Sequence, residues 1–467
     1  MNKYKKLINT TALFAVSNVL SKVLLALLLP LYTRTLTTTE YGTAELLMTV
    51  VQFIMPIVSL AIDNSIIRFS MSRETDPGVV LKSTMPIAFV ANFILIAIAL
   101  GLNWYPDLAS WAWSFWLVAL LNILRSWFSL YSQGTQQTTI FAQDNVLFNI
   151  YLVTCSVLFL YLFEWHLNGY FLAFIIADVL SILYLAFRLH LFATLARSSI
   201  NRQLLREMLI YSAPLVLNSI SWGIASMIDK SMIAAYYSLA DTGIYSAASK
   251  IPSLLNLFTG VFTQAWGLSM ISDYESERDT RFYENVFSYM HIVTLSAVIF
   301  VLILNNTIIP LILGDDFAQA AVYSPILLLG TYFLTYAGFC TSIYSAMKLS
   351  KQIMYSSVGG TVINVILNVL LIPSFGIMGA CIATCASCLY IASYRMINSR
   401  KYLPLHLEYR KLILSVGLVS VYAFLVALDI GALYGGLVVF AGMILLYRRD
   451  YQFLYRKVRG SELIRRG

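Results

Sequence analysis

Charged side chains are scarce in this sequence. Of its 467 residues only 12% are Asp, Glu, Lys or Arg, whereas 59% are hydrophobic, and the mean hydropathy is +0.76. So few charges cannot cover the surface of a soluble protein of this size. Apolar runs of the about 20 residues needed to cross a bilayer follow one another along the chain. The composition therefore predicts an all-α polytopic membrane protein.

Cysteine is scarce as well, and its pattern does not favour a metal site. Three of the five cysteines, Cys381, Cys385 and Cys388, have helical spacing, but no His or carboxylate stands near them as a further ligand. We therefore predict no disulfide, no metal and no cofactor. The phosphate-binding pattern GxxxxGK[ST] is also absent from the sequence, which argues against transport driven by ATP.

Fourteen apolar segments are predicted to span the membrane. The first of them contains Lys22 and is longer than the apolar core of a signal peptide, so we expect it to be retained. The last two are short, which leaves twelve spans as an alternative. The predicted limits are 8–32, 42–67, 80–102, 111–131, 141–163, 168–188, 208–236, 243–270, 285–309, 321–347, 352–373, 376–397, 411–428 and 431–447.

The distribution of basic residues supports this map. With the N-terminus in the cytoplasm, most of the 31 Lys and Arg fall on the cytoplasmic side, as the positive-inside rule requires. Only Arg34 lies outside, and four lie within spans: Lys22, Arg125, Lys230 and Lys250. We therefore expect both termini in the cytoplasm. The net charge of +8 is a topology signal on this interpretation, and no nucleic-acid partner is expected.

The sequence contains an internal repeat. "TALFAVSNVL" from Thr11 aligns with "SAPLVLNSIS" from Ser212, and at the same offset of 201 residues Gly42 aligns with Gly243. A second similarity pairs "SLYS" with "SIYS", followed by "GYFLA" and "GIMGA". The repeat predicts two pseudo-symmetric lobes of six helices, 1–195 and 196–400. A helix hairpin and basic tail at 401–467 would follow them. In transporters of repeated design the substrate site lies between the halves.

Seven charges lie well inside the predicted spans. Each would cost about 2.5–3.5 kcal/mol if it were left in the bilayer centre, so we expect these residues to face a water-filled cavity or one another. Four of the seven are basic, which suits an anionic ligand, and all of them precede residue 251. They are Lys22, Asp63, Arg125, Asp178, Asp229, Lys230 and Lys250.

Helical spacing places several of these residues on polar stripes. Asn18 and Lys22 share one face of the first predicted helix, and Asn218 and Asp229 share one face of the seventh, next to Lys230. Pairing of Asp229 with Lys22 or Lys250 would be a purely structural alternative. The candidates for substrate binding are Lys22, Arg125, Lys230, Lys250, Asn18 and Asn218, and those for charge pairing or ion coupling are Asp63, Asp178 and Asp229.

Three segments resemble a known family of transporters. "LPLYTRTLTTTEYGTAELL" at 29–47 is similar to the exit of the first helix and the entry of the second in the Wzx-type polysaccharide flippases. "LADTGIYSAASKI" repeats this pattern in the second half, and "IIPLILGDDFAQAAVYSPILLL" is similar to the outer turn before the tenth helix of these flippases. The family belongs to the multidrug/oligosaccharidyl-lipid/polysaccharide (MOP) superfamily, which also contains lipid II flippases and drug antiporters of the MATE type.

The resemblance implies a function and a set of partners. The protein would be a flippase in a bacterial inner membrane that moves undecaprenyl-pyrophosphate-linked oligosaccharides for O-antigen, capsule or exopolysaccharide synthesis. The two lobes would enclose a cationic cavity worked by alternating access, and the hairpin 411–447 would form a groove for the lipid tail. Membrane lipid, H⁺ or Na⁺, a polysaccharide polymerase and a chain-length regulator are the further partners implied.

Two other classes of protein remain as alternatives. A cation-coupled exporter of drugs or other small molecules from the same superfamily would need buried carboxylates most. A membrane enzyme of the same pathway, such as a glycan polymerase or ligase, would need acid, base or nucleophilic groups displayed outside. Glu164 and His166 lie together at one predicted outer turn without obvious partners. We therefore predict no catalytic residue and no enzymatic activity.

Overall fold

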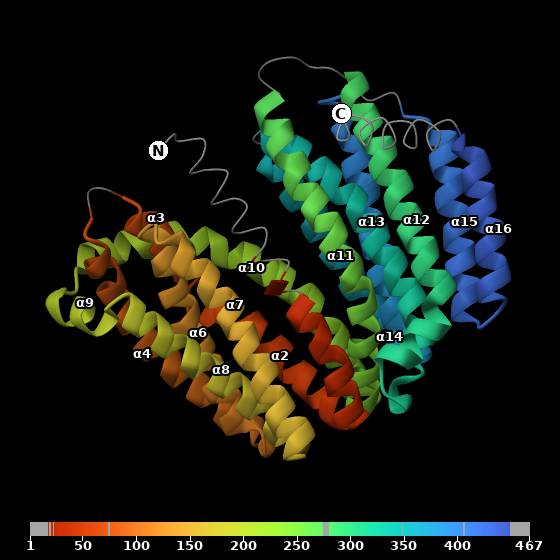
Figure 1. Ribbon diagram of the computed structural model, residues 1–467. Helices are drawn as coiled ribbons and strands as arrows, with labels where there is room; N and C mark the ends of the chain where they lie inside the picture. Colours follow the sequence, from red (N-terminus) through yellow and green to blue (C-terminus); the bar gives the residue numbers. More distant parts are fainter. Residues whose placement is uncertain are drawn as a thin grey trace, which may run out of the picture. The chain divides into compact units, whose positions relative to one another are not determined.

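The computed structural model describes residues 17, 20, 21, 23–72, 75–273, 280–347, 349–404 and 407–448, with some side chains inside the helices left undescribed. Every regular element in these ranges is a helix, as the composition predicts. The chain forms two compact units, Met1–Gly243 and Ile244–Gly467 (Figure 1).

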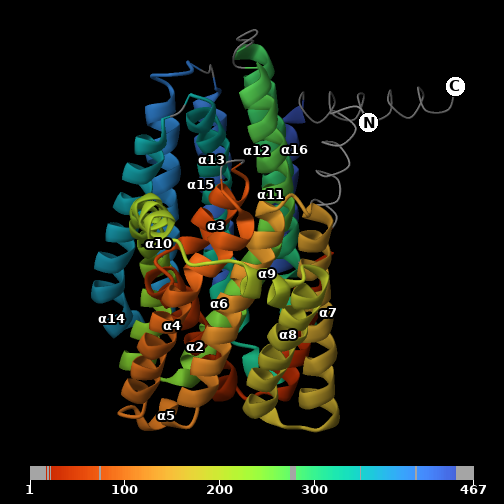
Figure 2. The ribbon, with the colours of Figure 1, turned by 90° about the vertical axis from the view of Figure 1, so that its left-hand side faces the viewer.

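The first unit is a bundle around one central helix. α6 packs against α3, α4, α7 and α8, and α10 packs against α2 and α3 (Figure 2). A further apolar helix, Val23–Thr35, precedes α2. The elements are α2 (Thr38–Val58), α3 (Ile62–Ser70), α4 (Pro77–Leu102), α5 (Pro106–Ala109), α6 (Ala112–Gly134), α7 (Thr138–Ser156), the π-helix η1 (Val157–Leu162), α8 (His166–Arg188), α9 (Leu191–Arg197) and α10 (Arg202–Tyr236).

The second unit is built around α13. This helix packs against α12, α14 and α15, while α16 packs against α12 and α15. The elements are α11 (Leu239–Asp273), which begins in the first unit, α12 (Thr280–Ile312), the 3₁₀-helix η2 (Asp315–Phe317), α13 (Ala320–Ala346), α14 (Ser350–Ser399), α15 (Tyr409–Ala427) and α16 (Ala432–Leu446). The predicted lobe boundary after residue 195 stays a prediction, and α10 packs within the first unit here.

The helices agree with the predicted spans. Within the described residues nine helices are long and apolar enough to cross a membrane, and two shorter apolar helices lie at the first and last predicted spans. α10 and α11, each of 35 residues, lie at the seventh and eighth spans but are not among the nine. α14 contains both the eleventh and the twelfth predicted spans. The chain turns between these two parts of α14 at Gly376, whose φ of 56° favours glycine.

The sequence repeat is visible at the starts of α2 and α11. The Thr37 hydroxyl accepts a hydrogen bond from the Glu40 backbone, and the Glu40 carboxylate accepts one from the Thr37 backbone. At the same offset of 201 residues the Ser238 hydroxyl accepts from the Asp241 backbone and donates to the Asp241 carboxylate. Both turns thus satisfy backbone donors that a helix start leaves open.

The equivalent glycines of the repeat approach each other. A Cβ atom on Gly42 would lie 1.8 Å from the carbonyl oxygen of Leu239, and a Cβ atom on Gly243 would lie 2.1 Å from that of Thr38. Thr38 and Leu239 are themselves one repeat apart. The contact is therefore reciprocal, as a local two-fold relation between the two helix starts requires, and neither position has room for a side chain.

The prolines within the two corresponding spans act differently. α2 contains Pro56 and ends two residues later, and Leu60 and Ala61 then adopt positive φ values before α3 begins. The second predicted span is therefore two helices. α11 instead continues through Pro252 as one helix.

Candidate substrate and coupling site

Arg125 lies in a buried ionic cluster of the first unit. Its Nε is 2.9 Å from Oδ1 of Asp178, and its Nη1 is 3.5 Å from Oδ2 of Asp144. Both carboxylates are fully buried, and the guanidinium carbon lies 3.8 Å from the ring centroid of Phe148. α6, α7 and α8 each contribute one charged residue. We refer to Arg125, Asp144 and Asp178, with the two serines that contact Asp144, as the Arg125 cluster.

Helical spacing supplies the hydroxyls of the Arg125 cluster. Ser129 lies one turn after Arg125 on α6 and donates to Oδ2 of Asp144 over 2.8 Å. Ser181 lies three residues after Asp178 on α8 and donates to Oδ1 of Asp144. The cluster contains two carboxylates and one guanidinium, so one further positive charge would make it electrically neutral. A proton or a small cation would supply it, which is the chemistry that ion coupling requires.

Lys230 forms a second ionic pair, between α10 and α2. Its Nζ lies 2.9 Å from Oε2 of Glu45 and donates to the Thr49 hydroxyl, also over 2.9 Å. The lysine and glutamate side chains are 13% and 11% exposed, so the pair is less deeply buried than the Arg125 cluster. The adjacent Asp229 is buried.

Asp63 is held by a neutral partner. It lies in the first turn of α3, and its Oδ1 accepts a hydrogen bond of 2.8 Å from the indole nitrogen of Trp127 on α6. Trp127 is fully buried. The contact ties the short helix after the break in the second span to the centre of the first unit.

The remaining predicted residues are not brought together by the described structure. Lys22 and Asn18 lie outside the described residues, and the side chain of Asn218 is likewise not described. Lys250 is half-buried on the part of α11 that belongs to the second unit. A common aqueous path for the four basic residues therefore stays a prediction, with Arg125 and Lys230 each already in an ionic contact.

Sequence reasoning missed two acidic partners. Glu45 and Asp144 fall within four residues of the starts of predicted spans and were not counted as intramembrane charges, yet both are buried. The positions of Thr49 and Ser129, one turn from a charged residue on the same helix face, were the available signals. With these acids included, the surplus of buried basic residues in the spans disappears, so this support for an anionic ligand is withdrawn.

The second unit also contains a buried cation that the sequence did not single out. Arg395, near the end of α14, is 5% exposed. Its Nε donates to the Ser356 hydroxyl over 2.8 Å, and its two terminal nitrogens donate to the hydroxyls of Thr341 and Ser357 over 2.6 and 2.9 Å. The expectation that all intramembrane charges precede residue 251 is therefore wrong. Arg395 lies near the end of a predicted span, and a residue at such a position can still be buried by neighbouring helices.

A neutral network surrounds His291 in the same unit. The imidazole Nδ1 lies 2.7 Å from the Tyr336 hydroxyl, and Nε2 lies 2.9 Å from the Tyr447 hydroxyl and 3.2 Å from that of Ser415. These residues come from α12, α13 and α15 and from the end of α16. The network attaches the C-terminal hairpin of α15 and α16 to the rest of the unit.

Solved structures with a similar fold are membrane transporters. An inward-facing MATE family multidrug resistance transporter of the MOP superfamily aligns with a TM-score of 0.68 at 15% identity, over 82% of this chain and 94% of its own. The lipid II flippase MurJ in an inward closed conformation aligns with a TM-score of 0.67 at 15% identity, over 96% of this chain and 99% of its own. These likenesses establish the fold, as predicted.

Sequence relatives connect the fold to glycan synthesis. A probable low-salt glycan biosynthesis flippase, Agl15 of Haloferax volcanii, is 26% identical over 193 residues, which are 39% of each chain. An uncharacterized membrane protein of Methanocaldococcus jannaschii is 25% identical over 283 residues, 56% of this chain and 54% of its own. The chain thus spans about half or less of each relative's length. The profile of one family matches residues 7–266, and the chain belongs to that family, which is described as Polysaccharide biosynthesis protein.

Proposed function

We propose that the protein is a flippase that moves undecaprenyl-pyrophosphate-linked oligosaccharide units from the cytoplasmic to the outer face of a bacterial inner membrane. The glycan would serve O-antigen, capsule or exopolysaccharide synthesis. The observation that carries the proposal is the likeness to the lipid II flippase over 96% of this chain, combined with the polysaccharide family match. The likeness to the MATE transporter covers 82%.

The charged residues would act by exchanging partners. A pyrophosphate brings about two negative charges, which compete with Glu45 for Lys230 and require charge-assisted hydrogen bonds in a low dielectric. Lys22, Lys250, Asn18 and Asn218 are the further residues proposed to bind the substrate. Binding of the anion would thus offset the cost of breaking the ion pair between Lys230 and Glu45. Re-formation of that pair would favour release of the anion.

Ion coupling is proposed for the acidic residues. The Arg125 cluster, which includes Asp178, would take up or release one H⁺ or Na⁺ as its helices move, and Asp63 and Asp229 are the further candidates. Alternating access then needs only that the cation stabilises one arrangement more than the other. A polymerase and a chain-length regulator would receive the glycan outside.

The direct test is flipping in liposomes. Purified protein is reconstituted with a fluorescent lipid-linked oligosaccharide, and an impermeant glycosidase added outside reports how much of the glycan faces each side. We expect Lys230→Ala and Lys22→Ala to abolish flipping and Lys230→Arg to retain part of it, because the phosphates need positive charge. Arg202→Ala, at an exposed position at the start of α10, is the matched control. Absence of flipping by the folded wild type would reject the function.

One alternative has a specific observation in its favour. The TM-score with the MATE transporter is as high as that with the lipid II flippase, and the Arg125 cluster has buried carboxylates of the kind a cation-coupled exporter needs. Efflux of cationic dyes from the same liposomes under a proton or sodium gradient separates the two. Dye efflux without glycan flipping would favour the exporter.

A further inference from the structure

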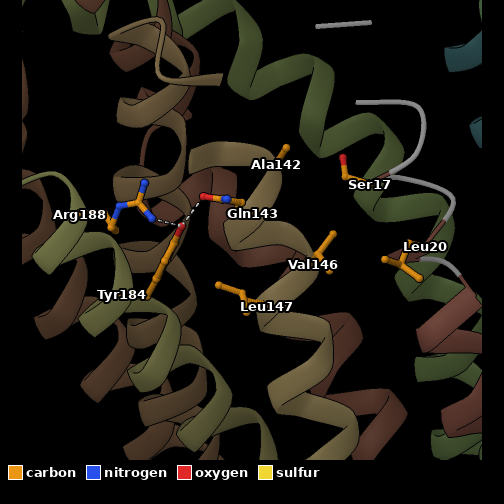
Figure 3. A pocket seen from close by; sticks show the side chains of 8 residues that line it. All are labelled: Ser17, Leu20, Ala142, Gln143, Val146, Leu147, Tyr184 and Arg188. Atoms are coloured by element: carbon orange, nitrogen blue, oxygen red, sulfur yellow. Dashed lines mark hydrogen bonds between the residues drawn. The ribbon is translucent and has the colours of Figure 1, made fainter. Parts of the chain in front are cut away.

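A cavity opens between α7, α8 and the first predicted span. Its volume is about 370 Å³, and Figure 3 shows side chains reaching it from both helices and from residues 17 and 20. All of the lining residues belong to the first unit, and none of them is a member of the Arg125 cluster or of the Lys230 pair. The lining residues are Ser17, Leu20, Ala142, Gln143, Val146, Leu147, Tyr184 and Arg188.

The polar side of the cavity is fixed by a short chain of hydrogen bonds. The Tyr184 hydroxyl donates to Oε1 of Gln143 over 2.8 Å and accepts from Nη1 of Arg188 over 3.5 Å. No carboxylate among the described residues lies within ion-pair distance of Arg188. A guanidinium has five donors, so most of them stay available to an anion at the cavity.

The opposite side of the cavity is apolar. Leu20, Val146 and Leu147 contribute hydrocarbon surface, and Leu20 is among the exposed large hydrophobic residues. α7 and α8 are both long and apolar enough to span a membrane. Arg188 lies in the last turn of α8 and Gln143 near the start of α7, at the end predicted to face the cytoplasm. A charged fork beside hydrocarbon at this depth matches an anionic group carried on an apolar tail.

The internal repeat provides a comparison for Arg188. The offset of 207 residues that aligns "GYFLA" with "GIMGA" also aligns Arg188 with Arg395. Arg395 is buried, and its donors are taken up by three hydroxyls and by the carbonyl oxygens of Ala337 and Ile353. Arg188 is exposed at a cavity. Equivalent positions of the repeat thus hold a buried arginine in the second unit, Arg395, and an exposed arginine in the first, Arg188.

We propose that this cavity binds the diphosphate of a polyprenyl diphosphate lipid, with Arg188 and Tyr184 on the phosphate oxygens and the apolar wall on the first isoprene units. This inference rests on the proposed function and adds an entry site for its substrate at the cytoplasmic level. A single-tailed lipid suits a cavity with one apolar wall, whereas a glycerophospholipid places two chains directly beside its phosphate.

Photolabelling tests the site without requiring transport. The full chain is placed in phosphatidylcholine nanodiscs and labelled with undecaprenyl diphosphate that bears a benzophenone near the head group. We expect labelled peptides from α7 and α8, and about tenfold weaker labelling for Arg188→Ala, since a charge-assisted contact is lost. Arg188→Lys should be intermediate. Val146→Trp, which fills the cavity without changing charge, should also weaken labelling, and Arg202→Ala should not.

Competition experiments identify the class of lipid that binds the cavity, and transport experiments show whether the entry site or the proposed function has failed. Unlabelled undecaprenyl diphosphate should displace the probe, whereas equal displacement by phosphatidylglycerol would show a site for bulk anionic lipid and overturn the proposal. Equal labelling of wild type and Arg188→Ala, both monodisperse by gel filtration, would also overturn it. If the wild type flips its glycan while labelling ignores Arg188, the entry site fails and the proposed function stands. If labelling depends on Arg188 but the wild type does not flip its glycan, the binding site is supported and the proposed function is rejected.

Discussion

The two units hold their buried charges in different ways. In the first unit, Arg125 and Lys230 are paired with buried carboxylates of Asp178, Asp144 and Glu45. In the second, the buried guanidinium of Arg395 is surrounded by hydroxyl and carbonyl groups, with no carboxylate among the described residues within ion-pair distance.

This difference has energetic consequences. Removing one member of a buried ion pair leaves an uncompensated charge, whereas removing a cation from neutral partners leaves groups that can find other acceptors or donors. Ionic partners also respond to added protons, cations or anions, and hydroxyls respond much less. We therefore expect the first unit to carry the charge-sensitive steps and the polar network of the second unit to fix its packing.

Arg125→Leu should have the largest effect on stability. It leaves Asp144 and Asp178 buried without a cation, so we expect the free energy of unfolding to fall by about 3–5 kcal/mol. Denaturant titration of the detergent-purified protein measures this. Arg125→Leu combined with Asp178→Leu should recover part of the loss, because the double change removes one of the two orphaned carboxylates as well. A loss below about 1 kcal/mol would remove the contrast between the units.

Arg395→Leu should cost less, about 2 kcal/mol, because its partners are neutral. The hydroxyls of Ser356 and Thr341 already donate to carbonyl oxygens of their own helices and keep those bonds. The same titration applies, with Arg395→Lys as the control that keeps the charge and loses the planar fork. A loss equal to that of Arg125→Leu would show that the type of partner does not matter.

Glu45→Ala should lower stability by about 1.5 kcal/mol, the lower end for a hydrogen bond to a charged group. The pair with Lys230 is partly exposed, and Thr49 remains as a partner. Thermal unfolding followed by tryptophan fluorescence is sufficient here. Thr49→Val is the matched control and should cost less. If Glu45→Ala stabilises the protein, the ion pair is strained and the partner-exchange mechanism gains a driving force.

Tyr447→Phe should have the smallest effect, about 0.6 kcal/mol, typical of a hydrogen bond between membrane helices. It removes the contacts of the Tyr447 hydroxyl to His291 and to Ser415, whereas His291 keeps its contacts to Ser415 and Tyr336. Hydrogen exchange should speed up in α16 while α13 is unchanged. Faster exchange throughout the second unit would mean that the network supports the whole bundle.

The sequence was sufficient for the architecture because that information is local. Length and apolarity determine each span, and the Thr37 and Ser238 turns that start α2 and α11 contain their own capping residues. The fold class is confirmed by the helices and by the likeness to MATE and MurJ structures. The break after Pro56 and the continuity of α11 through Pro252 could not be distinguished, since both prolines stand in similar apolar sequence.

Partners across helices were beyond sequence reasoning. Arg125 meets Asp178 at a separation of 53 residues and Lys230 meets Glu45 at 185, and nothing in either helix alone determines which faces turn together. Residues near span ends were the second difficulty. Glu45, Asp144 and Arg395 lie near the ends of predicted spans and do not stand out as intramembrane charges in the sequence, yet all three are buried.

The reciprocal contact of Gly42 and Gly243 bears on how such a chain diverges after duplication. In a homodimeric ancestor of the two halves, these would be one codon meeting itself across the symmetry axis, and any side chain there would clash twice. In the fused chain they are two codons that can mutate independently, yet each still occupies the space that a side chain on the other would need. We expect related chains to keep the pair small together, as a trace of ancestry that outlasts the sequence similarity of the halves.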